Sequence, residues 1–483
     1  MKANFKKSFW KKAAAGLMAI GLFALAGCGT SGAGNADDKI GRDPKNPPVY
    51  TSEETFRTAA WGLPPNAGVG SGKYKDNPNY ATAENYKTMA DCGFAYAMPT
   101  QDFNDDNVFN TLEVAQAAGM KVLVRDLHPQ GVQYSIQLGG TYEEARARFN
   151  ARTDALKARY DKFKEYESFA GVLAYDEPDT TLYPAIAAGQ DWFLKHYPEY
   201  EYYVNLLPNY ASANQLFGAD ANKGYTYADH VSMFVEEVNP TFISYDHYPI
   251  VQDVYGQKAL LDDFYYNLYV FANESKKNDI PFYIYLQTMG FHSNAPLESY
   301  AEFAWQSYTS MAFGVRGIQC FCYWTLMEET NNVTSGCVDR DGTILPTYGW
   351  VQTVFNEIKS FEEVYMSFDW DGFKLYEASS VENDMFSMIG NNQLEELKGV
   401  KSVNTDQDLI VGQFLDDEGY PAFMVSNASS PFLLESANVT MEFDSSVTTA
   451  IVYAKGEKRT VKLDNHKLTL ELGSGEGYFV LPL

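Results

Sequence analysis

Apolar residues recur along most of the chain in short β-type runs. Each run is followed by a loop rich in polar and aromatic residues and then by a stretch with helical spacing. Strands and helices that alternate at this spacing predict right-handed βαβ units and a parallel sheet. Eight such units predict an α/β fold closed into a (β/α)8 barrel, or TIM barrel. The runs are Phe56–Trp61, Phe94–Pro99, Lys121–Asp126, Ala170–Glu177, Glu201–Leu207, Thr241–Tyr248, Pro281–Gln287 and Gly317–Trp324.

The segments between the runs are long and periodic enough to form helices. They include Tyr142–Tyr166, Leu182–His196, Leu260–Lys277 and Leu297–Phe313, with a last helix over Trp350–Phe361. A doubly wound open sheet is the competing fold, and it would carry a glycine-rich phosphate turn after its first strand. The segment Trp61–Pro65 opens no helix, so the barrel is favoured.

After about Phe368 the pattern changes to short alternating runs separated by Asp, Asn and Gly turns. Leu409–Leu415 and Tyr420–Ser426 flank the turn Asp416–Gly419 and predict a hairpin. Further short runs follow as far as Leu481 and predict a small all-β sandwich. We therefore expect a barrel over residues 51–368 and a β-sandwich domain over residues 369–483.

The N-terminus has the pattern of an export signal. Lysines precede an apolar stretch from Ala13 to Ala26, which is too short for a transmembrane anchor. The stretch ends in Leu25, Ala26, Gly27 and Cys28, and is similar to the lipobox of bacterial lipoproteins. This similarity implies a lipoprotein signal peptide over residues 1–27, lipidation (palmitate) at Cys28, and attachment to the extracytoplasmic face of the cell membrane. Residues 28–50 read as a flexible tether.

Charge and cysteine content exclude several classes of function. The formal charge is −26, and residues 1–27 carry five lysines and no acidic residue, so the mature protein is near −31. Such a surface repels nucleic acid. No cluster has metal-ligand spacing, and nothing in the sequence implies a cofactor. Cys92, Cys320, Cys322 and Cys337 read as small buried residues, with a disulfide to Cys337 left open.

In a (β/α)8 barrel the reactive groups lie where the strands end, so polar and aromatic residues at the ends of the runs are the candidates for the site. We interpret most of them as substrate-binding residues. For His128 and His247 a structural role remains the alternative. The candidates are Trp61, Arg125, Asp126, His128, Asp176, Glu177, Asn205, Asp246, His247, Tyr248, Gln287, Tyr323 and Trp324.

Two of these carboxylic acids suit general acid/base chemistry. Glu177 ends the fourth run among aromatic residues, where desolvation would raise its pKa and keep it protonated. Alternatively, the acids of Asp176–Pro178 serve only to begin the next helix. Asp246 ends the sixth run and shares its parity with Phe242 and Ser244, which points it into the barrel. Its alternative role is structural, for example a pair with Arg125.

The run Tyr175–Pro178 resembles the Asn-Glu-Pro motif of the large glycoside hydrolase clan with (β/α)8 barrels, in which the strand-four glutamate is the general acid/base. The resemblance implies that Glu177 has this role and that a carbohydrate is the substrate. Asp176 replaces the asparagine of that family, and Gln287 stands near the position of its strand-seven nucleophile. Asp246 is therefore the candidate for the second catalytic carboxylate, as nucleophile or as base.

The sequence thus predicts an exported, lipid-anchored glycoside hydrolase that cleaves O-glycosidic bonds of an oligo- or polysaccharide. A non-catalytic carbohydrate-binding lipoprotein on a degenerate hydrolase barrel is the alternative, motivated by the missing strand-seven acid. A solute-binding lipoprotein of an uptake transporter is a third reading, and it would require two lobes joined by a hinge. The sequence leaves the sugar, the linkage, the stereochemical outcome and the oligomeric state open.

Overall fold

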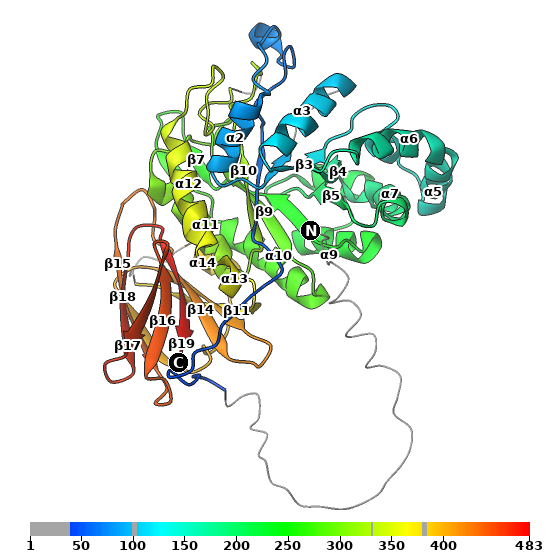
Figure 1. The fold of residues 1–483 in the computed structure, drawn as a ribbon. Coiled ribbons are helices and arrows are strands. Elements are labelled where there is room, and N and C mark those ends of the chain that lie inside the picture. The colour runs from blue at the N-terminus through cyan, green and yellow to red at the C-terminus, as the bar shows by residue number, and fades with distance from the viewer. Residues whose placement is uncertain (1–38, 99–103, 330–331, 379–383) are drawn as a thin grey trace, which may run out of the picture.

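A parallel barrel forms the first part of the protein (Figure 1). The computed structural model describes residues 39–98, 104–329, 332–378 and 384–483. Within them, eight strands form one parallel sheet in the order β5-β4-β3-β2-β1-β10-β9-β6. These strands are β1 (Arg57–Trp61), β2 (Tyr96–Met98), β3 (Lys121–Val124), β4 (Phe169–Asp176), β5 (Glu201–Asn205), β6 (Ile243–Asp246), β9 (Phe282–Gln287) and β10 (Gly317–Phe321).

Contacts just beyond the end of β5 close the sheet into a ring. Leu206 pairs with Tyr245 in a parallel bridge, and the Leu206 N–H donates to the Ser244 carbonyl at 2.8 Å. The chain is therefore a (β/α)8 barrel, as the spacing of apolar runs predicts. Each of the eight predicted runs coincides with one barrel strand to within a few residues at its ends.

Helices surround the barrel, and several coincide with the periodic segments of the sequence. The segment Tyr142–Tyr166 forms two helices rather than one, because the chain leaves helical geometry at Arg152. The helices of this part are α2 (Ala83–Asp91), α3 (Asp105–Ala117), α4 (Val132–Gln137), α5 (Tyr142–Ala151), α6 (Thr153–Phe163), α7 (Tyr183–His196), α8 (Ala213–Phe217), α9 (Tyr227–Val238), α10 (Phe264–Asn278), α11 (Tyr300–Ala312), α12 (Pro346–Lys359) and α13 (Glu362–Tyr365). A hairpin of β7 (Ile250–Gln252) and β8 (Lys258–Leu260) follows β6.

A buried ion pair fills the end of the barrel where the strands begin. Arg57 at the start of β1 donates to Glu201 at the start of β5 over 2.7 Å. The guanidinium lies over the Tyr96 ring at 4.0 Å, where the π-face also favours a cation. Above this pair, an inner ring that includes Leu123, Leu173 and Tyr285 fills the lumen. The opposite end, where the strands finish, is therefore where a ligand site can form.

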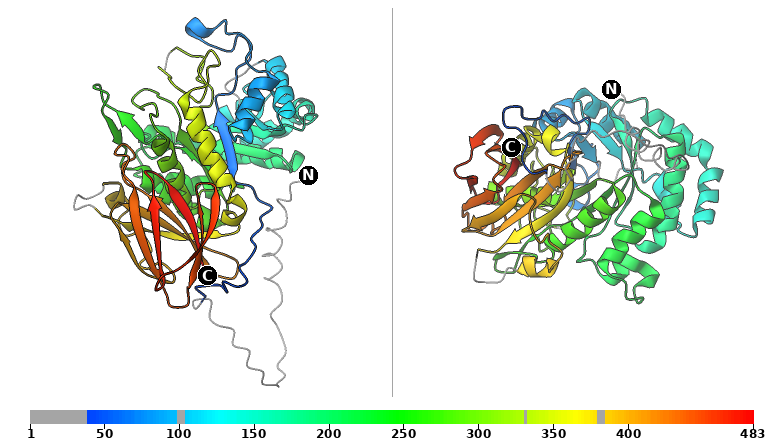
Figure 2. Two further views of the ribbon diagram at one scale, coloured as in Figure 1. Left: turned by 60° about the vertical axis from the view of Figure 1, so that its left-hand side comes forward. Right: turned by 90° about the horizontal axis from the view of Figure 1, so that it is seen from below.

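An all-β domain follows the barrel (Figure 2). Its larger sheet contains β11 (Asp369–Tyr376), β13 (Leu409–Leu415), β14 (Pro421–Asn427), β16 (Thr449–Ala454), β17 (Glu457–Lys462) and β19 (Gly477–Pro482). The smaller sheet contains β12 (Val400–Thr405), β15 (Ala437–Phe443) and β18 (Lys467–Leu472). A separate apolar core lies between the two sheets. The pair β13 and β14 is antiparallel, which confirms the predicted hairpin. A short helix, α14 (Asp384–Ile389), precedes β12.

The described part of the expected tether, residues 39–50, is held by the β-domain. Arg42 pairs with Asp416 and lies over the Tyr420 ring at 4.0 Å. Tyr50 packs on Phe368 with 4.7 Å between ring centroids. This corrects the expectation of a flexible linker up to residue 50, since an ion pair and aromatic contacts fix the segment. Cys28 and the predicted signal peptide lie outside the described residues.

Helix α11 joins the barrel to the β-domain, and its residues from Ala301 to Ala312 are buried. On the barrel side, Gln306 accepts a hydrogen bond from the Gln287 N–H at 3.0 Å. On the other side, Ser426 of β14 donates to the Tyr308 carbonyl at 2.9 Å. The two parts of the protein therefore share one core through this helix.

Gly412 of β13 tests how tightly the two parts are packed. A Cβ at this position would lie 2.1 Å from the Ala312 carbonyl oxygen, a backbone atom that cannot move aside. We expect Gly412→Ala to lower the free energy of unfolding by about 1–3 kcal/mol, measured by urea denaturation. Gly349→Ala in α12 is the matched control, because a Cβ there meets no atom within 4 Å. That change should stabilise the protein by about 0.5–1 kcal/mol. Equal effects would show that the contact is not tight.

Candidate active site

Carboxyl groups from two strands meet at the mouth of the barrel around one amide side chain. Asn205 ends β5 between β4 and β6, and it pairs with Asp176 of β4 in the sheet. Its Nδ2 donates to Asp246 Oδ1 at 2.8 Å, and its Oδ1 accepts from Ser244 Oγ at 3.0 Å. Asn205 is therefore fixed at both ends of its amide and holds Asp246 in place.

The inward direction of Asp246 follows the predicted parity of β6. Phe242 belongs to the inner ring of the barrel, and Ser244 contacts Tyr203 inside it at 2.5 Å. Tyr245, of the opposite parity, stacks on Phe271 of α10 with 3.9 Å between ring centroids. Alternation along the strand therefore places Asp246 on the inner side, as expected from the sequence.

Asp176 points inward for a reason that the sequence pattern does not show. Leu173 of β4 pairs with Tyr203, while Tyr175 pairs with Val204, so Ala174 is an extra residue in the strand. Such a bulge reverses which residues face the lumen. Leu173 packs in the inner ring and Tyr175 packs against the outer core. Asp176 then returns to the inner side at the mouth.

Glu177 leaves the strand with a left-handed backbone, at φ 54°. Its N–H donates to the Asn205 carbonyl at 2.8 Å, which holds this conformation. A non-glycine residue in this region costs on the order of 1–3 kcal/mol and is often found at functional sites. The turn takes Glu177 out of the strand alternation. The negative charges of Glu177 and Asp176 both act on Asp246. We call Asp176, Glu177 and Asp246 the carboxyl cluster.

Burial and mutual repulsion change the protonation of the cluster. Burial and the charge of Asp176 raise the pKa of Glu177 to about 7, against the opposing effect of Arg125. Burial and the charge of Glu177 raise the pKa of Asp246 well above its ordinary value. Burial also raises the pKa of Asp176, and Arg125 opposes this shift. At least one member is therefore protonated near neutral pH, as general acid catalysis requires.

Arg125 is the cation that the cluster contacts. It follows β3, and its Nη1 lies 3.5 Å from Asp176 Oδ2. Its guanidinium also lies over the Trp61 ring, 5.1 Å from the centroid. Arg125 Nε is buried and has no hydrogen-bond partner within the described residues. A planar group with five donors and so few acceptors is prepared to bind further oxygen atoms.

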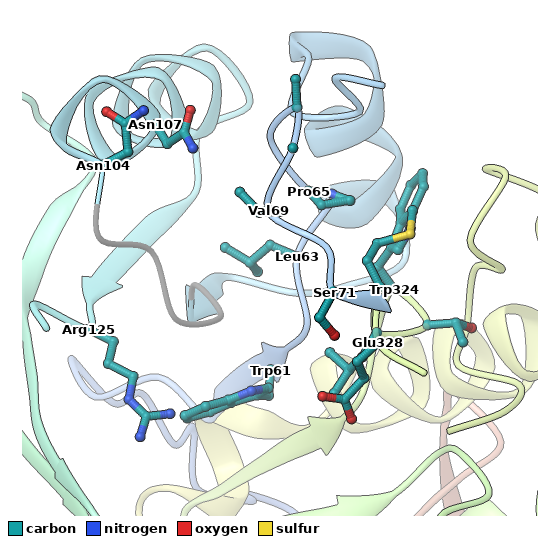
Figure 3. Close-up of a pocket in the computed structure, with 15 residues that line it drawn as sticks. Trp61, Leu63, Pro65, Val69, Ser71, Asn104, Asn107, Arg125, Trp324 and Glu328 are labelled. Atoms are coloured by element: carbon teal, nitrogen blue, oxygen red, sulfur yellow. The ribbon is translucent and has the colours of Figure 1, made fainter. Parts of the chain in front are cut away.

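A cavity of about 610 Å³ adjoins the cluster at Arg125 and Trp61 (Figure 3). The three carboxyl residues do not line this cavity, and Arg125, which contacts Asp176, connects it to the cluster. Trp324, which the sequence indicated, lines it too, and its ring packs on Tyr80 at 4.9 Å. The lining residues that the sequence did not indicate are Leu63, Pro65, Ala67, Gly68, Val69, Ser71, Asn104, Asn107, Thr325, Leu326, Met327 and Glu328. They belong to the loops after β1 and β10 and to the start of α3.

Two tyrosines lie on the other side of the cluster. The Tyr248 ring stacks on Phe321, with centroids 5.4 Å apart and planes at 24°. Burial and the charge of Asp246 raise the pKa of Tyr248. The charge of Asp246 also raises the pKa of Tyr210, which packs edge-on against His247. Tyr210 stands in a loop after β5, where no sequence pattern singled it out.

Asp126 makes structural contacts in place of the predicted binding contacts, and His128 contacts its own loop. Both oxygens of Asp126 pair with Arg159 of α6, at 2.7 Å to Nε and 2.7 Å to Nη2. The carboxylate is 2% exposed, so it is fully used as a structural anchor. His128 Nδ1 accepts the Gln130 N–H at 3.1 Å within its own loop. The structural reading of His128 therefore accounts for its contact.

Three more of the predicted binding residues have side chains that contact other parts of the protein: Gln287, His247 and Tyr323. Gln287 exchanges hydrogen bonds with the Ile250 backbone, at 3.0 and 2.9 Å, and also donates to the Ala295 carbonyl. His247 Nε2 contacts Asp263 Oδ1 at 3.0 Å on the outer side of the barrel. Tyr323 is 1% exposed and packs edge-on against Phe94. Their side chains are occupied by the scaffold, which corrects the prediction that they bind substrate.

Within the described residues, no group of three His, Cys, Asp or Glu side chains could hold a metal ion. The four described cysteines are buried and unpaired. Among the helices of the same residues, none is long and apolar enough to cross a membrane.

Comparisons with known proteins report similarity of fold only. No protein-family model and no curated protein sequence matches the chain. A β-galactosidase from the psychrophilic Marinomonas ef1 has a TM-score of 0.44 and 8% identity, covering 64% of this chain and 60% of that one. A β-galactosidase from Halorubrum lacusprofundi has a TM-score of 0.33 and 12% identity, covering 63% and 58%. The family 1 β-glucosidase from Thermotoga maritima has a TM-score of 0.39 and 10% identity, covering 63% and 98%. The chain thus spans less than two thirds of either β-galactosidase.

The raised pKa of Glu177 predicts a stability that depends on pH. Because the folded-state pKa is about 7 and the ordinary value is 4.5, folding favours the neutral form. This contribution is complete below pH 4.5 and is lost as the pH rises through 7. Glu177→Gln stays neutral, so its free energy of unfolding should gain on that of the natural protein between pH 4.5 and 8. The gain should be roughly 1 kcal/mol, because Glu177 is exposed and water screens its charge. Urea unfolding at both pH values measures it. The same change at Glu143, whose side chain is 75% exposed, should show little such gain. A gain no larger at Glu177 than at Glu143 would contradict the shift.

Proposed function

We propose that the protein is a glycoside hydrolase that cleaves O-glycosidic bonds of an oligo- or polysaccharide by carboxylic acid chemistry. The supporting observation is the carboxyl cluster at the mouth of a (β/α)8 barrel, with Glu177 at a pKa of about 7. Hydrolysis of a glycosidic bond needs one carboxylic acid that protonates the leaving oxygen and one carboxylate that acts on the anomeric carbon. A barrel mouth with several coupled carboxyl groups can supply both.

Glu177 is the proposed proton donor. It stands directly after β4, is open to solvent, and has its pKa raised by the negative charge of Asp176. A group with a pKa near the working pH is both protonated often enough and acidic enough to transfer its proton. The second catalytic carboxyl comes from the same cluster: Asp246 of β6, the candidate from the sequence, and Asp176 of β4 are the two groups available.

The cavity beside the cluster is suited to a sugar. Trp61 and Trp324 supply aromatic surface, and aromatic faces pack on the apolar faces of sugar rings. Arg125, Asn104 and Asn107 line it with hydrogen-bonding groups that can meet hydroxyls. Tyr248 completes the proposed contacts on the cluster side, where Asn205 positions Asp246. The mixture of flat apolar surface and polar side chains supports a carbohydrate rather than a fully apolar ligand.

Removing the proton donor gives the direct test. On 4-methylumbelliferyl and 4-nitrophenyl glycosides, Glu177→Gln should lower kcat/KM by about 10²–10⁴-fold while the circular dichroism spectrum stays unchanged. The matched variant Glu143→Gln should keep full activity. In the natural protein, activity should fall as the pH rises through about 7, where Glu177 loses its proton. Full turnover by Glu177→Gln would remove Glu177 from this role.

Calorimetry with oligosaccharides tests the alternative function. Binding of an oligosaccharide without formation of any product would support a non-catalytic carbohydrate-binding protein.

We also propose that the protein is exported and anchored to the membrane by lipid at Cys28. The support is the sequence alone, in which the lipobox-like run Leu25–Cys28 follows an apolar segment. In the bacterial cell, the natural protein should incorporate labelled palmitate and sediment with membranes. Cys28→Ser should do neither, because the thiol that carries the lipid is absent, whereas Cys92→Ser should behave as the natural protein. Labelling that persists in Cys28→Ser would contradict the proposal.

A further inference from the structure

Hydrolysis by two carboxyl groups requires that one be charged when the other is protonated. The following inference rests on the proposed function and concerns which member of the cluster carries the charge. A carboxylate stays charged in a buried site only where a cation or several donors stabilise it. The surroundings of Asp176 and Asp246 therefore distinguish their roles.

Asp246 lacks the surroundings of a charged carboxylate. It is 5% exposed, and its carboxyl accepts a hydrogen bond from the Asn205 amide. It forms no ion pair within the described residues, and His247 beside it turns outward to Asp263. Glu177 and Asp176 face it with like charge, and the nearby Tyr210 and Tyr248 are phenols with raised pKa. A carboxyl group enclosed by acids and phenols keeps its proton.

Asp176 has the cation that Asp246 lacks. Arg125 Nη1 lies 3.5 Å from its Oδ2, and the Asp176 side chain is 23% exposed, so water also reaches it. The charged and titratable groups that interact with Asp176 or Glu177 are Arg125, Asp246 and the phenols of Tyr175, Tyr210, Tyr248 and Tyr285. Arg125 is the positive group of this set. It also lines the cavity, which places Asp176 on the side where the sugar would enter.

The strand-seven position offers no competing carboxylate. Gln287 is an amide and 1% exposed, and its side chain is bound to the backbone of Ile250 and Ala295. The bulge at Ala174 is what brings Asp176 to the inner side, so the charged group comes from β4 instead.

We propose that Asp176 is the charged catalytic carboxylate, that Arg125 is its positioning residue, and that Asp246 holds a proton beside Glu177. In a retaining reaction an Asp176 oxygen bonds to the anomeric carbon as the glycosidic C–O bond breaks. The electron pair of that bond goes to the leaving oxygen, which takes the Glu177 proton. Water then gives a proton to Glu177, bonds to the anomeric carbon and releases Asp176 as carboxylate. In an inverting reaction Asp176 takes a proton from the water that attacks.

Azide rescue tests this assignment in either reaction. The glycoside that the natural protein cleaves fastest, among 2,4-dinitrophenyl glycosides, is given to Asp176→Gly and Asp246→Gly. Asp176→Gly should lose at least about a hundredfold in kcat. Sodium azide should restore turnover, because the small anion fills the vacated site, and the product should be a glycosyl azide of inverted anomeric configuration. Asp246→Gly should give no such product. Circular dichroism checks that both variants fold, and Asp176→Asn, nearly the same size, serves if Asp176→Gly does not. Asp176→Asn should lose activity to the same extent.

The pH profile of Arg125 variants is a second test, because a change at a merely structural residue would not move it. In Arg125→Met the cation beside Asp176 is gone, so the low-pH limb of kcat/KM should move to higher pH. Arg125→Lys keeps a cation and should return the limb most of the way to its natural position. A limb that stays in place in Arg125→Met would overturn the positioning role.

The outcomes separate the two proposals. Inverted glycosyl azide from Asp246→Gly and none from the Asp176 variant would overturn this assignment and leave the hydrolase intact. Full activity of Asp176→Asn would overturn it in the same way. Absence of cleavage by the natural protein on every aryl glycoside would overturn the proposed function, and the charge assignment with it.

Discussion

Three carboxyl groups gather at the mouth of the barrel while one guanidinium, Arg125, acts on two of them, and this imbalance of charge governs the site. With Asp176, Glu177 and Asp246 all ionised, two negative charges would remain unpaired in a partly buried space. The cluster reduces this energy by keeping protons, as the raised pKa values show. The chemistry that the site can perform follows from where these protons reside. The same imbalance makes the folded protein less stable than it would be with neutral groups at these positions.

The periodic pattern of the sequence was sufficient to predict the barrel, because each βα unit repeats the same physical requirement. A parallel strand buried on both faces needs a run of apolar residues, and its helix needs one apolar face. Asp246 could be placed for the same reason, since plain alternation along β6 holds from Phe242 onward. The β-domain hairpin was also readable, because Asp416–Gly419 is a turn between two alternating runs.

Other site residues could not be placed from the sequence, because their direction depends on partners distant in the chain. Asp126 is held by Arg159, which arrives from α6, and Gln287 by the backbone of Ile250 and Ala295. The inward turn of Asp176 depends on the extra residue Ala174, which no periodicity reveals. Tyr210 and the cavity wall around Leu63 and Glu328 lie in loops. Their positions come from packing between loops rather than from any repeat.

The rest of the fold stabilises the unfavourable arrangement of residues at the mouth of the barrel. A left-handed Glu177 and a set of repelling acids persist only where the surrounding structure fixes them. The Arg57 and Glu201 pair fills the opposite end of the barrel, and Asn205 ties β5 to β6 where the ring closes. Helix α11 is buried on one side by the barrel and on the other by the β-domain, which braces the last strands. The sandwich therefore stabilises the barrel from outside. This stabilisation offsets the unfavourable concentration of acids at the place where the proposed chemistry needs them.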